Sequence, residues 1–588
     1  MVYGTGLILA CGVLMDSVEK AQDLLQLDKI NLSIHDHEIL HDVSLQLAAG
    51  QTLGIIGESG SGKSMTALSI MQLLPQGSLL SGNIRFMGQS LDRLSETRLC
   101  ELRGSEIGMI FQEPMTALNP VKTIGAQVSE SIRLHRLLSR QEADELTAQT
   151  LARVGLPNTQ FPLSRYPHEL SGGQRQRVVI AIAIACKPRL LIADEPTTAL
   201  DVTTQAGILD LLKSLQADED LALLLITHDL AVVSNMADDV VVMRQGRVVE
   251  QGDLTAVFSA PSHDYTRLLF EASALTGVAR AAKPAHESSL SANARLESLD
   301  SPAAEYESGG SSSDVVRLAP DAAVNTPLLR VKNLVCEYPL KRAGLFRKAT
   351  WFRAVDDVSF EIQRGQSLGL VGESGCGKST LTRALLGLMK LGGGSIELNG
   401  ESVSTAQEVS RAARREMQVV FQDPYGSFNP RHTVRRLVSE PLFLLEQPLS
   451  SAESDARVHA VMDSVGMLAS DSDKYIHEFS GGQRQRIAIA RALIVEPSLI
   501  ILDEAVSALD VSVRAQVLQL LDTLAAEQGL AYLFISHDLS VVQRVTDQVL
   551  VMRHGKIVEQ GATASVFAEP QHEYSAQLVA AAPRLQLS

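Results

Sequence analysis

The chain has 588 residues, 45% hydrophobic and 20% charged, a composition typical of globular proteins and long enough for several domains. Its net charge of −16 disfavours a general nucleic-acid-binding protein, because phosphate contacts need clustered Lys and Arg. Five scattered cysteines predict neither a disulfide framework nor a zinc site, and no apolar run reaches the roughly 18–20 residues that cross a bilayer.

Residues 1–22 precede the first expected strand and form an N-terminal tail. They begin with MVYGTGLILACGVLM, which is apolar but lacks the basic leading segment and the small-residue cleavage site of a secretory signal. We therefore expect translation to begin at Met15, which leaves residues 1–14 as upstream sequence. A membrane-surface tail is the alternative.

The chain contains an internal duplication. The heptapeptide SGGQRQR occurs at 171–177 and again, unchanged, at 480–486, and the same offset of 309 residues relates Asp194 to Asp503. Upstream of the heptapeptide the offset drifts slightly, as expected for insertions in loops. The duplication predicts two homologous halves.

The halves are expected to span 23–275 and 327–588. Within each, short apolar runs alternate with longer helical patterns, which predicts an α/β domain with a parallel sheet covered on both faces. Between the halves, 276–326 is rich in Ala, Ser, Asp and Glu and contains SGGSSS. We expect this segment to be a flexible linker.

Two segments, 57–64 (GESGSGKS) and 372–379 (GESGCGKS), match the P-loop pattern G-x-x-x-x-G-K-[ST] between an apolar strand and a helix. Their glycines let backbone N–H groups surround phosphate oxygens at a helix start, which favours negative charge. Lys63 and Lys378 are expected to reach the β- and γ-phosphates of ATP. The residues expected to bind ATP in these loops are Gly57, Glu58, Ser59, Gly60, Ser61, Gly62, Lys63, Ser64, Gly372, Glu373, Ser374, Gly375, Cys376, Gly377, Lys378, Ser379 and Thr380.

Two apolar strands, in LLIADEP and LIILDEA, each end in two acids. Buried carboxylates are costly unless they serve a cation or a reaction. We expect Asp194 and Asp503 to coordinate Mg²⁺, together with the P-loop serines Ser64 and Ser379. The second acid of each pair suits a general base that activates the attacking water, a role worth about 10²–10⁴-fold in rate. The two expected bases are Glu195 and Glu504.

In each half the P-loop, FQ[ED]P, SGGQ, DE, ALD and [TS]HD follow one another in the same order. This set resembles the tandem nucleotide-binding subunit of an ATP-binding cassette (ABC) transporter, over about 23–275 and 327–588. The resemblance implies two P-loop NTPase domains, each with a mainly parallel sheet core, an antiparallel β subdomain and a helical subdomain. It also implies ATP hydrolysis coupled to transmembrane transport, with ATP and Mg²⁺ as cofactors.

The resemblance extends the expected site beyond the P-loops and the acids. Gln112 and Gln422 would contact Mg²⁺ and the attacking water, and would report the nucleotide state to the permease. His228 and His537 would contact the γ-phosphate. Two aspartates would lie on the loop that crosses between the halves, Asp201 and Asp510.

The repeated SGGQ begins a helix, with Ser171 or Ser480 at the N-cap position and two glycines allowing close backbone approach. Each half therefore has two anion-binding helix starts but needs only one nucleotide. In ABC proteins the halves pack head to tail, and each signature completes the site of the other half. The signature residues expected to bind ATP are Ser171, Gly173, Ser480 and Gly482.

Two departures from the family pattern distinguish the halves. Tyr338 occupies the place of the aromatic residue that stacks on adenine, whereas Asp36 falls at the matching place in the first half, where His35 could substitute. Ala505 and Val506 replace a Pro-Thr pair beside the second catalytic acid. We leave open whether the two sites turn over equally.

The segments APSHDYTRLL and EPQHEYSAQL, at 260–269 and 569–578, are similar to the P-x-H-x-Y-[ST] tails of dipeptide, oligopeptide and nickel importers. We expect His263 and Tyr265 to pack this tail onto the sheet domain. The resemblance favours peptide import in a bacterium. The alternatives are an importer of glutathione, of a microcin C-like compound, or of nickel or another solute.

The resemblance implies two transmembrane permease subunits as partners and, indirectly, a solute-binding protein. The chain would lie peripherally at the cytoplasmic face of the bacterial inner membrane, contact the membrane only through the permease and bind no nucleic acid. A soluble ABC protein acting on ribosomes is disfavoured, because such proteins join their cassettes with a long, charged, helical linker. A non-hydrolysing scaffold is disfavoured because both expected bases are present.

Overall fold

The structure, a computed structural model, describes residues 23–198, 200–277, 326–339, 351–403, 409–423, 426–507 and 509–583. The tail and nearly all of the expected linker lie outside these ranges, so the start at Met15 and the flexible linker remain predictions. The chain divides into two compact units, one built mainly from the first half and one mainly from the second. Each half is therefore described by itself.

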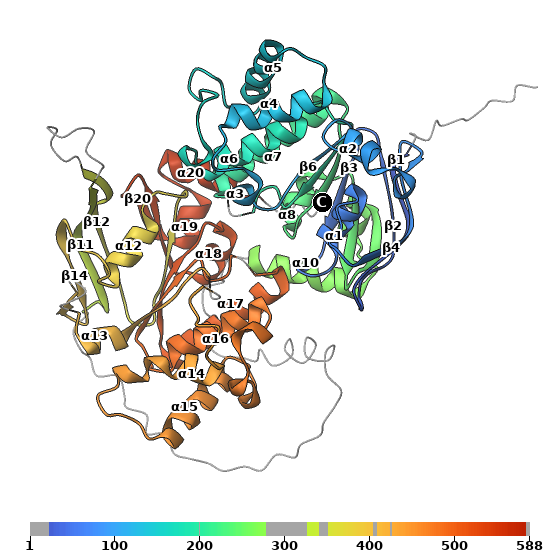
Figure 1. The fold of residues 1–588 in the computed structure, drawn as a ribbon. Coiled ribbons are helices and arrows are strands. Elements are labelled where there is room, and N and C mark those ends of the chain that lie inside the picture. Colours follow the sequence, from blue (N-terminus) through green and yellow to red (C-terminus); the bar gives the residue numbers. More distant parts are fainter. Residues whose placement is uncertain are drawn as a thin grey trace, which may run out of the picture. The chain divides into compact units, whose positions relative to one another are not determined.

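The first half contains two sheets (Figure 1). The core sheet has the order β10-β9-β3-β8-β7-β6, and all its neighbours are parallel except the edge pair of β10 and β9. The second sheet, β2-β1-β4-β5, is antiparallel. The strands are β1 (Asp23–Ile34), β2 (His37–Ala48), β3 (Thr52–Ile56), β4 (Ser78–Phe86), β5 (Gln89–Ser90), β6 (Ile107–Ile110), β7 (Leu190–Asp194), β8 (Ala222–Ile226), β9 (Asp239–Arg244) and β10 (Arg247–Asp253).

The central strands of the core sheet are buried along their whole length. Every residue of β3, β7 and β8 is buried, and these strands read TLGII, LLIAD and ALLLI. Parallel strands covered on both faces need such nearly continuous apolar runs, because neither face meets water. The buried Asp194 at the end of β7 departs from this pattern, which indicates a role in the site.

The helices of the first half cover the core sheet and form a helical subdomain. Ile132, Leu151 and Ile180, from three helices of the subdomain, belong to the same apolar cluster as Leu191 and Leu223 of the sheet. The subdomain therefore shares its core with the sheet. The helices are α1 (Lys63–Met71), α2 (Glu96–Leu102), α3 (Pro114–Ala117), α4 (Ile124–His135), α5 (Arg140–Arg153), α6 (Gly172–Ile184), α7 (Val202–Glu219), α8 (Leu230–Met236), α9 (Leu254–Ser259) and α10 (Asp264–Gly277), with short 3-10 turns η1 (Leu91–Arg93) and η2 (Pro167–Glu169).

The second half repeats both sheets. Its core sheet has the order β16-β17-β18-β13-β19-β20, parallel except for the pair of β19 and β20, and its antiparallel sheet has the order β12-β11-β14-β15. The strands are β11 (Leu329–Pro339), β12 (Trp351–Ile362), β13 (Ser367–Val371), β14 (Gly393–Leu398), β15 (Glu401–Ser402), β16 (Met417–Val420), β17 (Leu499–Asp503), β18 (Ala531–Ile535), β19 (Gln548–Arg553) and β20 (Lys556–Ala562).

The helices of the second half follow the same order. Among the described helices of the whole chain, none combines the length and the apolar character that a membrane span requires. The predicted architecture, a mainly parallel core with antiparallel and helical subdomains in each half, is confirmed. The helices are α12 (Lys378–Leu385), α13 (Arg411–Glu416), α14 (Val434–Ser439), α15 (Ser451–Ser464), α16 (Gly481–Leu493), α17 (Val511–Gln528), α18 (Leu539–Val545), α19 (Thr563–Ala568) and α20 (Glu573–Ala581), with 3-10 turns η4 (Glu440–Leu444), η5 (Ala469–Asp473) and η6 (Ile476–Glu478).

Candidate functional site

The first P-loop, 57–64, joins β3 to α1 through backbone conformations that favour glycine. Gly57, Gly60 and Gly62 have φ angles of 151°, 78° and 100°. A Cβ atom added to Gly57 would lie 2.2 Å from the carbonyl oxygen of Met243. The pattern of glycines is therefore a steric requirement of this loop, as well as a phosphate-binding device.

The P-loop lysine lies folded back over its own loop. The Nζ atom of Lys63 donates hydrogen bonds to the carbonyl oxygens of Gly57 and Glu58, both at 2.7 Å, and only 6% of the residue is exposed. Lys378 repeats both bonds in the second half, at 2.6 and 3.0 Å. Burial lowers the pKa of Lys63, and the nearby carboxylate of Glu195 opposes this shift. The loop thus presents a desolvated cation, which suits a phosphate ligand.

Oxygen ligands for a magnesium ion meet at the end of β7. The Oγ atom of Ser64 donates to Oδ1 of Asp194 at 3.1 Å, and Asp194 is 5% exposed. Burial raises the pKa of the Asp194 carboxyl, so a bound cation would relieve an electrostatic cost. The pair fits Mg²⁺, which prefers oxygen ligands and keeps part of its water shell. Within the described second half, Ser379 and Asp503 form no such bond.

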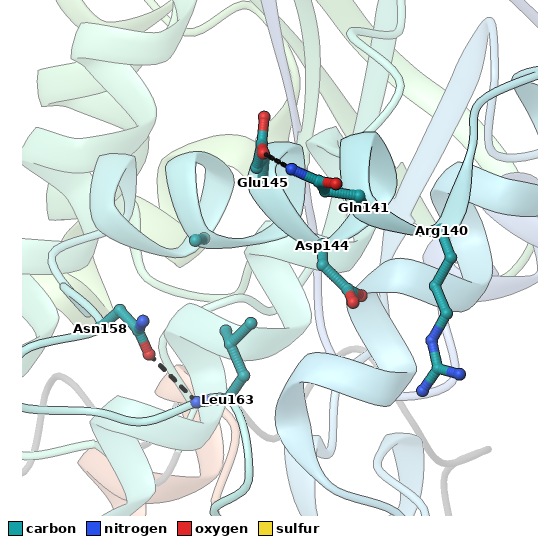
Figure 2. A pocket seen from close by; sticks show the side chains of 7 residues that line it. Arg140, Gln141, Asp144, Glu145, Asn158 and Leu163 are labelled. Carbon is teal, nitrogen blue, oxygen red and sulfur yellow. Dashed lines mark hydrogen bonds between the residues drawn. The ribbon is translucent and has the colours of Figure 1, made fainter.

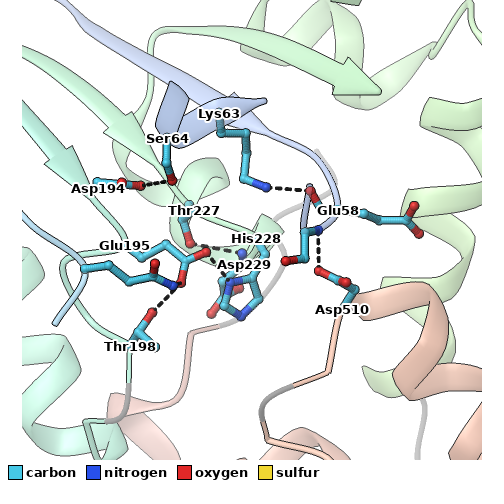
Figure 3. A network of polar contacts seen from close by, with 12 residues as sticks. Glu58, Lys63, Ser64, Asp194, Glu195, Thr198, Thr227, His228, Asp229 and Asp510 are labelled. Carbon is cyan, nitrogen blue, oxygen red and sulfur yellow. Dashed lines mark hydrogen bonds and ion pairs between the residues drawn. The ribbon is translucent and has the colours of Figure 1, made fainter. Parts of the chain in front are cut away.

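Three side chains contact the carboxylate of Glu195, two from predicted site residues and one that was not predicted (Figure 3). It receives hydrogen bonds from Nε2 of Gln112 at 2.9 Å and from Oγ1 of Thr198 at 2.8 Å, and Nδ1 of His228 lies 3.2 Å away. Gln112, Glu195 and His228 follow β6, β7 and β8, three neighbouring parallel strands. Strand ends that meet at one sheet edge bring these distant residues together.

Glu195 is held in its charged form. Burial alone would raise its pKa, but the hydrogen bond and charge of His228, the Thr198 hydroxyl and the Lys63 ammonium together lower the pKa to about 2. Burial alone would also raise the pKa of Glu504, but the hydrogen bond and charge of His537 and the charge of Lys378 lower it. There Ser507 donates to the Glu504 backbone carbonyl and not to its carboxylate. Gln422 donates to Glu504 at 2.8 Å, and His537 lies 3.4 Å from it.

Both expected bases lie in left-handed backbone conformations, with φ angles of 48° for Glu195 and 51° for Glu504. Each donates its backbone N–H to the end of the adjacent strand, at 2.8 Å to Ile226 and at 2.9 Å to Ile535. Non-glycine residues adopt this conformation rarely, and such strain is often found at functional sites. The turn directs the second acid away from the strand that holds the first.

The signature serines cap their helices as predicted. Ser171 accepts the N–H of Gln174 through Oγ at 3.3 Å and donates its own N–H to the Gln174 side chain at 3.0 Å, and Ser480 forms the same capping box in α16. A Cβ atom on Gly173 would lie 2.2 Å from Thr204. No hydrogen bond joins the described signature residues to the P-loop of their own half.

The expected match between Asp36 and Tyr338 is wrong. Lys29 and Asn333 occupy equivalent left-handed positions, with φ angles of 50° and 45°. A Cβ atom added to Gly82 of β4 would lie 2.4 Å from the Lys29 carbonyl oxygen, and one added to Gly394 of β14 would lie 2.3 Å from that of Asn333. Counting five residues onward from each places Ile34, not Asp36, at the position of Tyr338. Asp36 lies exposed in the turn between β1 and β2. The first half therefore has an aliphatic residue where the second has an aromatic one.

Sequence reasoning missed several residues around the P-loops. Thr198 contacts the carboxylate of Glu195, but a lone Thr after an acidic pair carries no specific signal. Tyr265 is buried in one apolar cluster with Ile56 and Val242 of the core sheet, which confirms the expected packing of the tail, and its hydroxyl also accepts the N–H of Glu58. The exact recurrence of His and Tyr in both tails was the signal that could have revealed this contact.

An open surface hollow of the first half lies elsewhere, between α5 and the loop that follows it (Figure 2). Its wall contains a hydrogen bond from Gln141 to Glu145 at 3.0 Å. None of the predicted site residues belongs to it. The lining residues are Arg140, Gln141, Asp144, Glu145, Ala148, Asn158 and Leu163.

Parts of this chain are similar to known protein families. The family profile described as "ABC transporter" matches residues 40–198 and 355–507, and the profile "Oligopeptide/dipeptide transporter, C-terminal region" matches 249–292. A solved structure of a bacterial ABC transporter cassette is 25% identical and covers 40% of this chain and 98% of its own, with a TM-score of 0.36.

Two relatives match nearly the whole chain. The glutathione import ATP-binding protein of Salmonella choleraesuis is 46% identical over 577 residues, which covers 96% of this chain and 90% of the relative. The protein of the same name in Escherichia coli K12 is 45% identical over 580 residues, with the same coverage. The chain therefore belongs to the ABC transporter family, as a tandem ATP-binding protein.

Proposed function

We propose that this chain is the ATP-hydrolysing, energy-coupling subunit of a bacterial importer of small peptides. The observation that carries the proposal is the duplicated cluster in which a Gln, a His and a charged Glu converge beside a P-loop lysine. Glu195 meets Gln112 and His228 in the first half, and the second half repeats the arrangement around Glu504.

In the proposed chemistry, Lys63 and Lys378 bind the β- and γ-phosphates of ATP, with the P-loop N–H groups around them. Ser64, Asp194 and Gln112 would hold Mg²⁺ in the first half, and Ser379, Asp503 and Gln422 would hold it in the second. When bound, the ion neutralises phosphate charge. The anionic carboxylates of Glu195 and Glu504 accept a proton from the attacking water, and His228 and His537 contact the γ-phosphate.

The signature helices supply the second anion-binding helix start of each half. We infer that Ser171 and Gly173 complete the site of Lys378, and that Ser480 and Gly482 complete the site of Lys63. Ser171 and Ser480 are both exposed at their helix N-termini, which supports a role toward a ligand outside their own P-loop. Closure of the halves on ATP would then drive the permease, and hydrolysis would reset it.

The proposed solute is a peptide, with glutathione the first to test. The relatives at 45–46% identity are named for glutathione import, and the matched C-terminal region is that of oligopeptide and dipeptide transporters. The partners would be two permease subunits and a solute-binding protein, with the chain at the cytoplasmic face of the inner membrane.

Uptake by a deletion strain tests the proposal. We expect loss of labelled glutathione or dipeptide uptake, restored by the wild-type gene but not by the Glu195→Gln, Glu504→Gln double variant. Loss of nickel uptake alone would overturn the peptide solute. Unchanged uptake of all three, with ribosomes and no permease co-purifying, would favour a soluble ABC protein instead.

A further inference from the structure

The last helix of each half begins beside the P-loop of the same half. The Tyr265 hydroxyl, at the start of α10, accepts a hydrogen bond from the backbone N–H of Glu58 at 3.2 Å. Tyr574, at the start of α20, accepts the N–H of Glu373 at 3.0 Å. The contact thus occurs twice, at equivalent P-loop positions.

The peptide group between Gly57 and Glu58 forms a hydrogen bond at each of its two ends. The N–H of Glu58 and the carbonyl of Gly57 belong to one peptide unit, and Lys63 donates to that carbonyl at 2.7 Å. The second half repeats this geometry, with Lys378 at 2.6 Å from the Gly372 carbonyl. The tyrosine hydroxyl therefore fixes the plane whose other end positions the phosphate-binding lysine.

The tyrosine rings are themselves firmly placed. Tyr265 is 5% exposed and Tyr574 is 1% exposed. The guanidinium of Arg244, the last residue of β9, lies 4.9 Å from the centre of the Tyr265 ring, and Arg553 lies 4.6 Å from the Tyr574 ring. Cation–π contacts of this kind favour one ring position. Each ring is thus fixed between its helix and the core sheet.

The histidine and an upstream glutamate fix the backbone that carries the ring. Nδ1 of His263 accepts the N–H of Tyr265 at 3.1 Å, and the carboxylate of Glu250 accepts the N–H groups of Ser262 and His263 at 2.7 and 3.1 Å. His572 and Glu559 repeat these bonds in the second half. The recurrent Pro-x-His-x-Tyr pattern is therefore a device that delivers a hydroxyl to the P-loop.

We propose that Tyr265 and Tyr574 are positioning residues that pre-organise the P-loops and thereby set nucleotide affinity. The inference rests on the proposed binding of ATP at these loops. Without the hydroxyl, the first peptide of the loop must be ordered when ATP binds, which weakens binding. A tyrosine that only packs its ring against the sheet would not have this effect, because Phe preserves the ring.

The test is binding of a non-hydrolysable ATP analogue with Mg²⁺ to the full chain. We expect Tyr265→Phe to weaken one of two sites about three- to tenfold, as for loss of one hydrogen bond, and the double variant with Tyr574→Phe to weaken both. The matched control is Tyr532→Phe. Tyr532 lies near the start of β18, at the end of the strand away from His537, and its buried hydroxyl is bonded to the backbone carbonyl of Leu521. This control variant should leave both affinities unchanged.

Two further readouts separate positioning from packing. Hydrogen exchange of the P-loop segment should become faster in Tyr265→Phe, since the Glu58 N–H loses its acceptor. In ATP hydrolysis, KM should rise by the same factor while kcat stays within about twofold, because the hydroxyl does not touch the Glu195 cluster.

Each outcome is decisive. Unchanged affinity and exchange in a folded Tyr265→Phe chain would overturn the inference while leaving the proposed function intact. Failure of the wild-type chain to bind the analogue would overturn both. If Tyr265→Phe does not fold, Tyr574→Phe provides the same comparison in the other half.

Discussion

The change Glu250→Gln tests how the last helix of the first half is anchored. The carboxylate accepts the N–H and the hydroxyl of Ser262, each at 2.7 Å, and the N–H of His263 at 3.1 Å. Burial alone would raise its pKa, but the nearby Thr266 hydroxyl and the hydrogen bonds from Ser262 and His263 lower it from 4.5 to about 2. The charged form is therefore the one that the fold stabilises.

The lowered pKa sets the size and the direction of the effect. A shift of this size would correspond to about 3 kcal/mol at about 1.4 kcal/mol per pKa unit. Glu250 is partly exposed, and solvent screening reduces the expected free energy to about 1–2 kcal/mol. Because the pKa is lower in the folded chain, this stabilisation is complete above about pH 5 and is lost as the pH falls from 4.5 toward 2.

Calorimetry of the nucleotide-free chain between pH 7 and pH 3 measures this effect. We expect Glu250→Gln to lower one transition by about 3–6 °C at pH 7, at about 2–4 °C per kcal/mol for a domain of this size, and by less than half as much at pH 3. The matched control is Glu271→Gln, an exposed position on α10, the helix that Glu250 of β10 anchors. A shift that does not depend on pH, or an equal shift in the control, would refute the anchoring argument.

Three further predictions concern the two nucleotide sites. Replacing Glu195 and Glu504 together by Gln should lower ATP turnover about 10²–10⁴-fold with binding retained, and substantial residual phosphate release would exclude them as bases. Cys376 is 6% exposed and burial raises the pKa of its thiol, so mass spectrometry should show it alkylated much more slowly than exposed Cys100, and more slowly still with ATP; equal rates would contradict its place inside the loop. Replacing Tyr338 by Leu should weaken adenine nucleotide binding at one site by about 0.5–1.5 kcal/mol in equilibrium titrations, and an unchanged affinity would exclude stacking.

The sequence predicts the catalytic cluster well because its chemistry constrains both residue type and strand position. Gln112, Glu195 and His228 are far apart in the chain, but each follows an apolar run. Parallel strands place such residues at one edge of the sheet, so the order of motifs already implies their meeting. The structure adds the left-handed backbone conformation of Glu195, which the residue type does not predict.

The parts that sequence reasoning missed depend on register or on side-chain direction. The left-handed positions at Lys29 and Asn333 mark equivalent places in β1 and β11. Counting from them shows that Ile34 corresponds to Tyr338. Likewise, Thr198 and Ser507 have similar chemistry but donate to different oxygens, one to a carboxylate and one to a backbone carbonyl. Such choices follow from packing around the side chain.

These differences indicate that the duplicated sites are not chemically equal. The first half has an aliphatic residue at the position of Tyr338, and its Glu195 carboxylate receives one more hydroxyl bond than Glu504 does. A carboxylate that accepts more hydrogen bonds is a weaker base, and an aliphatic residue stacks less well on a purine than an aromatic one. Both differences act in the same direction, so the site of Lys378 is the one expected to bind more tightly and to hold the stronger base.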